Sequence, residues 1–187
     1  MKKETVYTIL LAPVGWLLRL LAFLPLRALF VLSDLLAPFV YHIIRYRRKI
    51  VRKNLRNSFP EKSAKEIRRI EHRFYRHFCD YFFETVKLLH ISDDEMRRRM
   101  KFIHAERIEN TLNSGRSVIM MLGHYGNWEY ISSISLWLHV TNTDLGQIYR
   151  PLKNAWADRL FLKIRSRFGL ANISKNDTLR ARAFGRR

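Results

Sequence analysis

The sequence has a single cysteine, Cys79, among its 187 residues. One cysteine excludes an internal disulfide, a cysteine-based zinc site and a CxxC redox centre. The spacings GxGxxG, GxxxxGK[ST], HExxH and GxSxG are also missing, so the usual signs of dinucleotide, P-loop, zincin and serine-hydrolase sites are missing with them. There is no internal repeat and no Gly/Ser linker. The length suits one core of ordinary size with a small appendage.

Acidic residues are scarce. The chain has 16 Asp and Glu against 35 Lys and Arg, which gives a net charge of +19 and a pI of about 10.7. Such an excess predicts an anionic partner, which is an anionic membrane, an acidic protein or a nucleic acid. Arginine dominates the basic set, and its planar guanidinium matches phosphate. Aromatic residues make up 13% of the chain, so we expect it to fold rather than to be a disordered basic tail.

The amino-terminal region is apolar but has no charge-free run of about 20 residues, which a clean membrane-spanning helix needs. Arg19, Arg27 and Asp34 interrupt residues 5–44, together with three prolines. The region is too long for a secretory signal and lacks a small-x-small cleavage site. We expect a pair of helices at the membrane interface, with Arg19 and Arg27 reaching the headgroups. The alternative is a buried helical hairpin in a soluble core.

A basic segment follows, with thirteen Lys or Arg and three Glu in residues 45–76. Within it, Ser63 and Glu66 have the spacing of a capping box just after Pro60, which predicts the start of a helix. Apolar residues then recur at steps of three and four, which predicts an amphipathic helix of about six turns. These residues are Ile67, Ile70, Phe74, Phe78, Tyr81, Phe82, Val86 and Leu89.

The stretch GHYGNWEY, residues 123–130, places His124 five positions before Glu129. This spacing alone carries little weight, because three other histidines have an acid at the same distance. Those pairs are His90 with Glu95, His104 with Glu109, and His139 with Asp144. All three pairs fall in expected turns or helix ends, where a structural role is enough to explain their presence. The surroundings therefore have to separate a working pair from a coincidence.

The surroundings of His124 differ. Residues 117–122, SVIMML, form a short apolar run that predicts a strand buried on both faces of a parallel sheet. A turn and a helix that begins at Asn127 are expected to follow. His124 would then lie at the carboxyl end of a central strand and Glu129 in the first turn of a helix, where open α/β sheets bind ligands. Gly126 would let the backbone bend sharply and approach a substrate closely.

The rest of the chain continues this alternation. Residues 145–151, LGQIYRP, predict a second strand that ends at Arg150. Residues 154–169 predict a basic amphipathic helix, and residues 170–174 a third strand. Strand, helix, strand, helix and strand in this order predict an α/β fold with a mostly parallel sheet and flanking helices.

The motif favours acid–base chemistry. A neutral imidazole can take a proton from a hydroxyl at neutral pH, and a carboxylate on its other nitrogen fixes the tautomer and stabilises the imidazolium. The turn holds no Ser or Cys nucleophile, so we expect a substrate hydroxyl to attack directly, with His124 as general base and Glu129 as its orienter. Backbone N–H groups around Asn127 could stabilise a developing oxyanion.

At these residues the sequence resembles a known family. GHYGNWE resembles the H-x4-[D/E] box of membrane-bound lysophospholipid and bacterial lipid A late acyltransferases. YRPLKN followed by Asp158 resembles their second box and RSRFG a third, and the apolar amino terminus and VRKNLRNSFP also fit. The resemblance implies that His124 and Glu129 are catalytic, that Arg150 binds substrate together with Asn127 and Gly126, and that no metal takes part.

The resemblance also implies the reactants. The donor would be an acyl thioester of acyl carrier protein or coenzyme A, with no other cofactor, and the acceptor a hydroxyl of a lipid A precursor or related glycolipid. The chain would bind anionic membrane lipid at the cytoplasmic face of the inner membrane, and no nucleic acid. We expect membrane-associated helices in residues 1–44 and the amino-terminal part of an acyltransferase domain in residues 45–187. Because the family continues with further strands, we expect a chain truncated at its carboxyl end and an incomplete sheet.

A non-enzymatic alternative is a membrane-anchored basic module that binds anionic lipid or nucleic acid. It accounts for the charge and for the apolar amino terminus. It does not account for GHYGNWE, and the chain has no recognisable nucleic-acid-binding motif.

Overall fold

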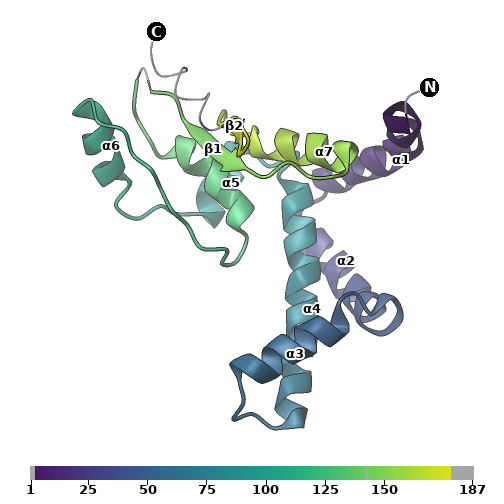
Figure 1. The fold of residues 1–187 in the computed structure, drawn as a ribbon. Helices are drawn as coiled ribbons and strands as arrows, with labels where there is room; N and C mark the ends of the chain where they lie inside the picture. The colour runs from purple at the N-terminus through teal and green to yellow at the C-terminus, as the bar shows by residue number, and fades with distance from the viewer. Residues whose placement is uncertain (1–2, 142, 178–187) are drawn as a thin grey trace.

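The structure is a computed structural model and describes residues 3–141 and 143–177. Most of the described chain is helical, and one long helix, α4, runs through its centre (Figure 1). The elements are α1 (Lys3–Phe23), α2 (Leu26–Phe39), the π-helical turn η1 (Val40–Ile44), α3 (Arg48–Ser58), α4 (Ala64–Lys87), α5 (Asp93–Arg99), α6 (Ala105–Asn113), the 3₁₀ helix η2 (Trp128–Leu136), β1 (Gly146–Tyr149), α7 (Ala155–Arg165) and β2 (Ala171–Ser174).

Helix α4 begins where the sequence predicts. The backbone N–H of Glu66 donates to the Ser63 hydroxyl at 3.3 Å, and the backbone N–H of Ser63 donates to the Glu66 carboxylate at 2.9 Å. The hydrogen bond from the Ser63 side chain lowers the pKa of Glu66. The buried row of the helix is shifted by about one position from the predicted stripe, so Phe74 and Phe82 are 40% and 43% exposed. The buried row is Ile67, Glu71, Tyr75, Cys79, Phe83 and Val86.

The two amino-terminal helices pack against α4. Helix α2 lies along it in the opposite direction (Figure 1), and the Ser33 hydroxyl donates to Asp80 at 2.6 Å. The end of α1 is held by the buried ammonium of Lys87, which donates to the carbonyls of Ala22 at 3.1 Å and Leu24 at 2.9 Å. These bonds satisfy carbonyls that the end of a helix leaves free.

Helix α1 also contacts α7. A Cβ atom at Gly15 would lie 3.5 Å from the Trp156 ring, so a glycine at this position lets the two helices approach closely. Trp156 packs against the same small cluster as Leu18 and Val86. Helix α7 is therefore in contact with the apolar amino terminus.

The outer faces of α1 and α2 are apolar and exposed. Trp16, Leu20 and Leu35 are 64%, 65% and 69% exposed. The stretch Leu26–Ile44 is one helix of 19 residues that is long and apolar enough to cross a membrane, and only 28% of its most apolar window is buried. Within the described residues, the outer faces of these two helices are not covered by other elements, and their position at a membrane interface stays a prediction.

The described sheet has two strands. Strands β1 and β2 pair in parallel, with Ile148 opposite Ile173, and α7 connects them. Helix α7 begins at Asn154, whose side chain accepts from the backbone N–H of Ala157 at 3.0 Å. Both strands and the helix between them were predicted, and the structure confirms them.

The predicted strand over residues 117–122 is wrong. The structure gives this run no regular secondary structure and leaves Ile119 and Met121 88% and 92% exposed. A buried strand needs a neighbouring strand to satisfy its backbone, and within the described residues β1 pairs only with β2. The fold is thus mostly helical with a small parallel sheet, rather than an α/β fold built on a larger sheet. The expected helix after the turn is the 3₁₀ helix η2.

Candidate active site

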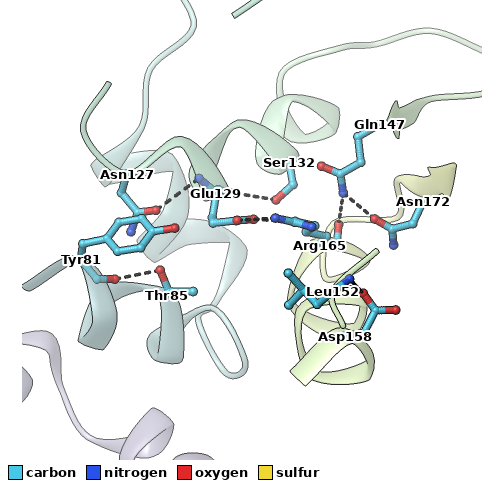
Figure 2. Close-up of polar contacts among 10 residues, drawn as sticks. All are labelled: Tyr81, Thr85, Asn127, Glu129, Ser132, Gln147, Leu152, Asp158, Arg165 and Asn172. Carbon is cyan, nitrogen blue, oxygen red and sulfur yellow. Dashed lines mark hydrogen bonds and ion pairs between the residues drawn. The ribbon is translucent and has the colours of Figure 1, made fainter. Parts of the chain in front are cut away.

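The turn GHYGNWEY rests on α4. Asn127 begins η2 as predicted, because its side-chain oxygen accepts from the backbone N–H of Glu129 at 3.2 Å (Figure 2). Its amide nitrogen donates to the Glu84 carboxylate of α4 at 3.0 Å. One turn earlier on α4, the Tyr81 ring stacks on Trp128 with centroids 4.7 Å apart. Two side chains of one helix thus fix the start of η2.

Glu129 is bound by an arginine. The Arg165 guanidinium donates to both carboxylate oxygens, at 2.7 and 2.9 Å (Figure 2). The side chain of Glu129 is 4% exposed and that of Arg165 is 19% exposed. The hydrogen bond with Glu129 raises the pKa of Arg165. A buried carboxylate requires such a partner, because an unpaired charge in the interior is costly.

The groups around this ion pair are polar and largely buried. The Ser132 hydroxyl donates to the backbone carbonyl of Glu129 at 2.9 Å. Burial, and then the negative charge of Glu129, raise the pKa of Tyr81 to about 12. Burial also raises the pKa of Glu84, against the hydrogen bond from Asn127 that lowers it. Tyr81 therefore stays neutral across physiological pH, while Glu84 is the acid whose protonation responds to this environment.

His124 is exposed and does not touch Glu129. Its ring meets the Trp128 ring edge-on, with centroids 4.8 Å apart. Over residues 3–141 and 143–177, the side chain of His124 makes no hydrogen bond or ion pair. The histidine and the acid of the motif are thus on the same turn but are not hydrogen-bonded to each other, and their catalytic roles remain predictions.

The three similar spacings do not bring their members together either. His139 contacts Glu109 at 3.2 Å rather than Asp144, and His104 contacts Glu106 at 3.1 Å rather than Glu109. His90 packs its ring on Phe23. A separation of five residues is therefore no guide to contact in this chain.

Gly126 has φ +58°, in the left-handed region that favours glycine, and no heavy atom lies within 4 Å of where its Cβ would be. The sharp turn predicted for this glycine is present. The open space beside it leaves the backbone accessible. A role in substrate binding stays a prediction for this residue.

Arg150 follows the last residue of β1 and is exposed. In the described part of the chain its side chain has no hydrogen bond or ion pair. A position on the same sheet edge as His124 would require a parallel strand at residues 117–122, and that strand is not formed. The acid of the second box has an internal role, because Asp158 accepts from the backbone N–H of Leu152 at 2.7 Å (Figure 2).

Sequence reasoning missed the partner of Glu129. Arg165 and Arg167 belong to the RSRFG box, which was recognised only as a family resemblance. Arg167 donates to the carbonyl of Ile91 at 2.7 Å and to Asp93 at 3.1 Å, and Phe168 is buried in the core cluster around Leu88. One signal in the sequence could have indicated this partner. The helix predicted over residues 154–169 has basic residues beside its apolar face.

The described residues contain no group of three or more His, Cys, Asp or Glu side chains placed to hold a metal ion. Their arrangement can supply an exposed imidazole, an exposed guanidinium and the backbone N–H groups at the start of η2. His124 lies on the turn that rests on α4 and Arg150 follows β1, so the imidazole is suited to proton transfer and the guanidinium to anion binding.

The chain matches the bacterial lipid A biosynthesis acyltransferase family over residues 3–183, and it belongs to that family. It is similar to a lipid A biosynthesis acyltransferase of Haemophilus influenzae, with 26% identity over 152 residues. That similarity covers 81% of this chain and 47% of the relative, so the chain spans about half the length of the relative. No solved structure matches.

Proposed function

We propose that the chain acts in O-acyl transfer, moving a fatty acyl group from a thioester to a hydroxyl of a lipid A precursor or related glycolipid. Membership of the family and the name of the Haemophilus influenzae relative support this reaction class. The donor is an acyl thioester of acyl carrier protein or coenzyme A, and no other cofactor is required. The net charge of +19 suits such reactants, because carrier, coenzyme and phosphorylated glycolipid are all anionic.

One observation carries the assignment of the site. The fold uses most polar residues of the three boxes internally: Asn127, Glu129, Asp158, Arg165 and Arg167 all bind other parts of the chain. Among the described residues of these boxes, the side chains of Tyr125, Lys153, His124 and Arg150 are exposed and make no hydrogen bond, and the resemblance assigns roles to the last two, His124 and Arg150. These two are free to meet a substrate.

In this proposal His124 removes the proton of the attacking hydroxyl. Glu129 orients the His124 ring by accepting a hydrogen bond from it. It can do so while paired with Arg165, because a carboxylate that accepts a bidentate guanidinium still has a lone pair on each oxygen. The imidazole reaches this carboxylate by a shift of the GHYGNWE turn about its glycines, while Arg165 keeps the carboxylate in place. Arg150 binds a phosphate or the acyl carbonyl, and N–H groups near Asn127 stabilise the oxyanion.

The proposed location is the cytoplasmic face of the inner membrane, with α1 and α2 at the interface. Their exposed Trp16, Leu20 and Leu35 would enter the lipid. Helix α2 is bound along one side by Asp80 and Arg76 of α4. A spanning α2 would carry these charges into the hydrocarbon at considerable cost, so an interfacial position is favoured.

The function is tested with the purified chain in detergent, an acyl carrier protein thioester and a lipid A precursor. Transfer is detected as a mass increase of the glycolipid by one acyl group. We expect His124→Ala to reduce the rate at least about 100-fold, which is the lower end of general-base contributions. His139→Ala is the matched control, because His139 is also exposed and is also followed by an acid at the fifth position.

The outcomes separate the proposals. Equal rates for wild type and His124→Ala would remove His124 from the mechanism. A wild-type chain that transfers nothing, yet binds anionic vesicles, would favour the non-enzymatic basic module. Circular dichroism of each variant shows whether a lost rate reflects a lost fold.

A further inference from the structure

Helix α3 lies beside α4 (Figure 1), and one of its faces is almost purely basic. An open groove of about 930 Å³ follows this face. The residues that line the groove include no acid and only one apolar side chain. They are Arg45, Arg47, Arg48, Lys49, Ile50, Arg52, Lys53, Arg56 and Asn57.

A buried carboxylate divides these basic residues into two sets. Glu71 of α4 is fully buried and accepts from Arg48 at 3.3 Å and from Arg52 at 2.9 Å. The hydrogen bond with Glu71 raises the pKa of Arg52. Arg48 also lies over the Tyr41 ring at 4.1 Å and donates to its hydroxyl at 3.0 Å. Arg48 and Arg52 are thus fixed by the fold and attach α3 to α4.

The second set is exposed. Lys49, Lys53 and Arg56 lie one turn apart on the same side of α3, and none of them forms an ion pair with Glu71. Within the described chain, the side chains of these three residues have no acidic partner. Like charges at this spacing repel one another, so the helix tolerates them at a cost that an anionic ligand would relieve.

A smaller hollow adjoins the groove between α3 and α4. It has about 110 Å³ and is lined by Arg52, Arg56 and Arg68 with Ala64 and Ile67. This is the space of a few water molecules at about 30 Å³ each, which is the scale of one phosphate group. Three guanidinium groups around such a hollow suit phosphate, because each can donate two parallel hydrogen bonds.

The position of α3 points to a lipid surface. It follows directly after the apolar helix Leu26–Ile44. Arg45 and Arg47 turn the chain there with φ of 54° and 48°, a conformation that is uncommon for residues other than glycine. Exposed apolar side chains accompany the charges, with Ile44 54% and Ile50 48% exposed. Basic clusters next to an apolar membrane helix are typical of binding to anionic lipid.

We propose that α3 is a phospholipid-headgroup site. Lys49, Lys53 and Arg56 bind the phosphates of anionic lipids along the groove, and the hollow at Arg52, Arg56 and Arg68 seats one phosphate. The exposed Ile44 and Ile50 enter the outer part of the lipid layer. This inference deepens the membrane association proposed above and is independent of acyl transfer, which is measured in detergent.

The test is sedimentation of the full chain with phosphatidylcholine vesicles that contain about one third phosphatidylglycerol. The triple variant Lys49→Gln, Lys53→Gln, Arg56→Gln should bind about 100-fold more weakly, at about fivefold for each basic residue lost. Its melting temperature should be no lower than that of wild type, because the Glu71 clamp is intact and the repulsion among three like charges is removed. Binding by wild type should weaken as salt rises, because exposed charges are screened over about 8 Å at physiological salt.

The matched control removes three exposed basic residues elsewhere: Arg98→Gln, Lys101→Gln, Arg107→Gln. It should bind within about threefold of wild type, because those residues lie outside the groove. Equal losses in the two triple variants would show attraction by total charge and overturn the proposal. Tighter binding to duplex DNA or to acyl carrier protein than to the anionic vesicles, lost in the α3 variant, would assign the groove to that partner instead and also overturn it.

Discussion

The guanidinium of Arg165 holds both carboxylate oxygens of Glu129, and 36 residues of chain separate the two. The bond joins η2 to the last turn of α7, so the acid of the HX4E motif is also part of the frame that holds the motif. Glu129 therefore contributes to the stability of the fold whether or not a substrate is bound. Effects of mutating Glu129 on activity must be separated from effects on folding.

Arg165→Met should lower the free energy of unfolding by about 3 kcal/mol, because it leaves the Glu129 carboxylate buried without a partner. The double variant Glu129→Gln, Arg165→Met should be more stable than Arg165→Met alone, since it removes the buried charge. Urea unfolding of wild type and the variants measures both differences. Lys163→Met on the exposed side of α7 is the control. A single variant as stable as wild type would mean that the ion pair contributes nothing to the fold.

Lys87→Met should destabilise the packing of α1. The substitution keeps most of the side-chain volume but leaves the carbonyls of Ala22 and Leu24 without their donor. A buried polar group that loses its partner costs about 1–3 kcal/mol. Thermal unfolding measures the loss, and proteolysis near Leu24 should become faster than in wild type. If the cleavage rate at this site stays the same, Lys87 does not hold the end of α1.

Glu84→Gln should change how stability depends on pH. Burial raises the pKa of Glu84 above its ordinary 4.5, so the folded state binds this proton more tightly than the unfolded state. The resulting stabilisation is complete below the unfolded pKa and is lost as pH rises through the folded pKa. Glutamine keeps an oxygen for the Asn127 amide and has no charge.

The melting temperature of the Glu84→Gln variant relative to wild type should therefore rise between about pH 4 and pH 7. Glu106→Gln provides a control of opposite sign, because a hydrogen bond from its own backbone N–H lowers the pKa of Glu106. That variant should lose stability relative to wild type as pH rises from below the lowered pKa to the ordinary pKa of 4.5, with little further change above it. Parallel pH profiles for wild type and Glu84→Gln would contradict the prediction.

Arg150→Lys should reduce acyl transfer about tenfold or more while the melting temperature stays unchanged. The substitution keeps the charge but loses the planar fork that binds phosphate or carboxylate oxygens in pairs. Arg150 is exposed and follows β1, so the fold does not depend on it. Steady-state rates in the detergent assay measure the effect. A variant with wild-type rates would place Arg150 outside the site.

Local signals in the sequence were reliable. The capping box at Ser63 and Glu66, the N-cap at Asn127 and the two short strands flanking α7 each rest on a few neighbouring residues, and the structure contains all of them. The same holds for the turn at Gly126, whose left-handed backbone favours glycine. The caps and the turn are fixed by interactions within one or two turns of chain, which the sequence displays directly, and the two strands find their pairing partner in each other across α7.

Long-range relationships were not predictable in this way. The run at 117–122 has the composition of a buried strand, but whether it forms one depends on a pairing partner elsewhere. Glu129 accepts its side-chain hydrogen bonds from Arg165, although His124 is much nearer in sequence. The buried row of α4 includes Glu71, an acid that only Arg48 and Arg52 of another helix make tolerable. In each case the deciding group comes from a distant part of the chain.

The close approach of α1 and α7 at Gly15 connects the apolar amino-terminal helices, for which we propose contact with the membrane, to the motif. Trp156 contacts α1 at one end of α7, and Arg165 binds Glu129 at the other, about 14 Å along the same helix at 1.5 Å per residue. A displacement of α1 on entering lipid would therefore be transmitted through α7 to the carboxylate beside the His124 turn. The physical state of the surrounding bilayer, and not only its supply of substrate, would then help to set the geometry of the reacting groups.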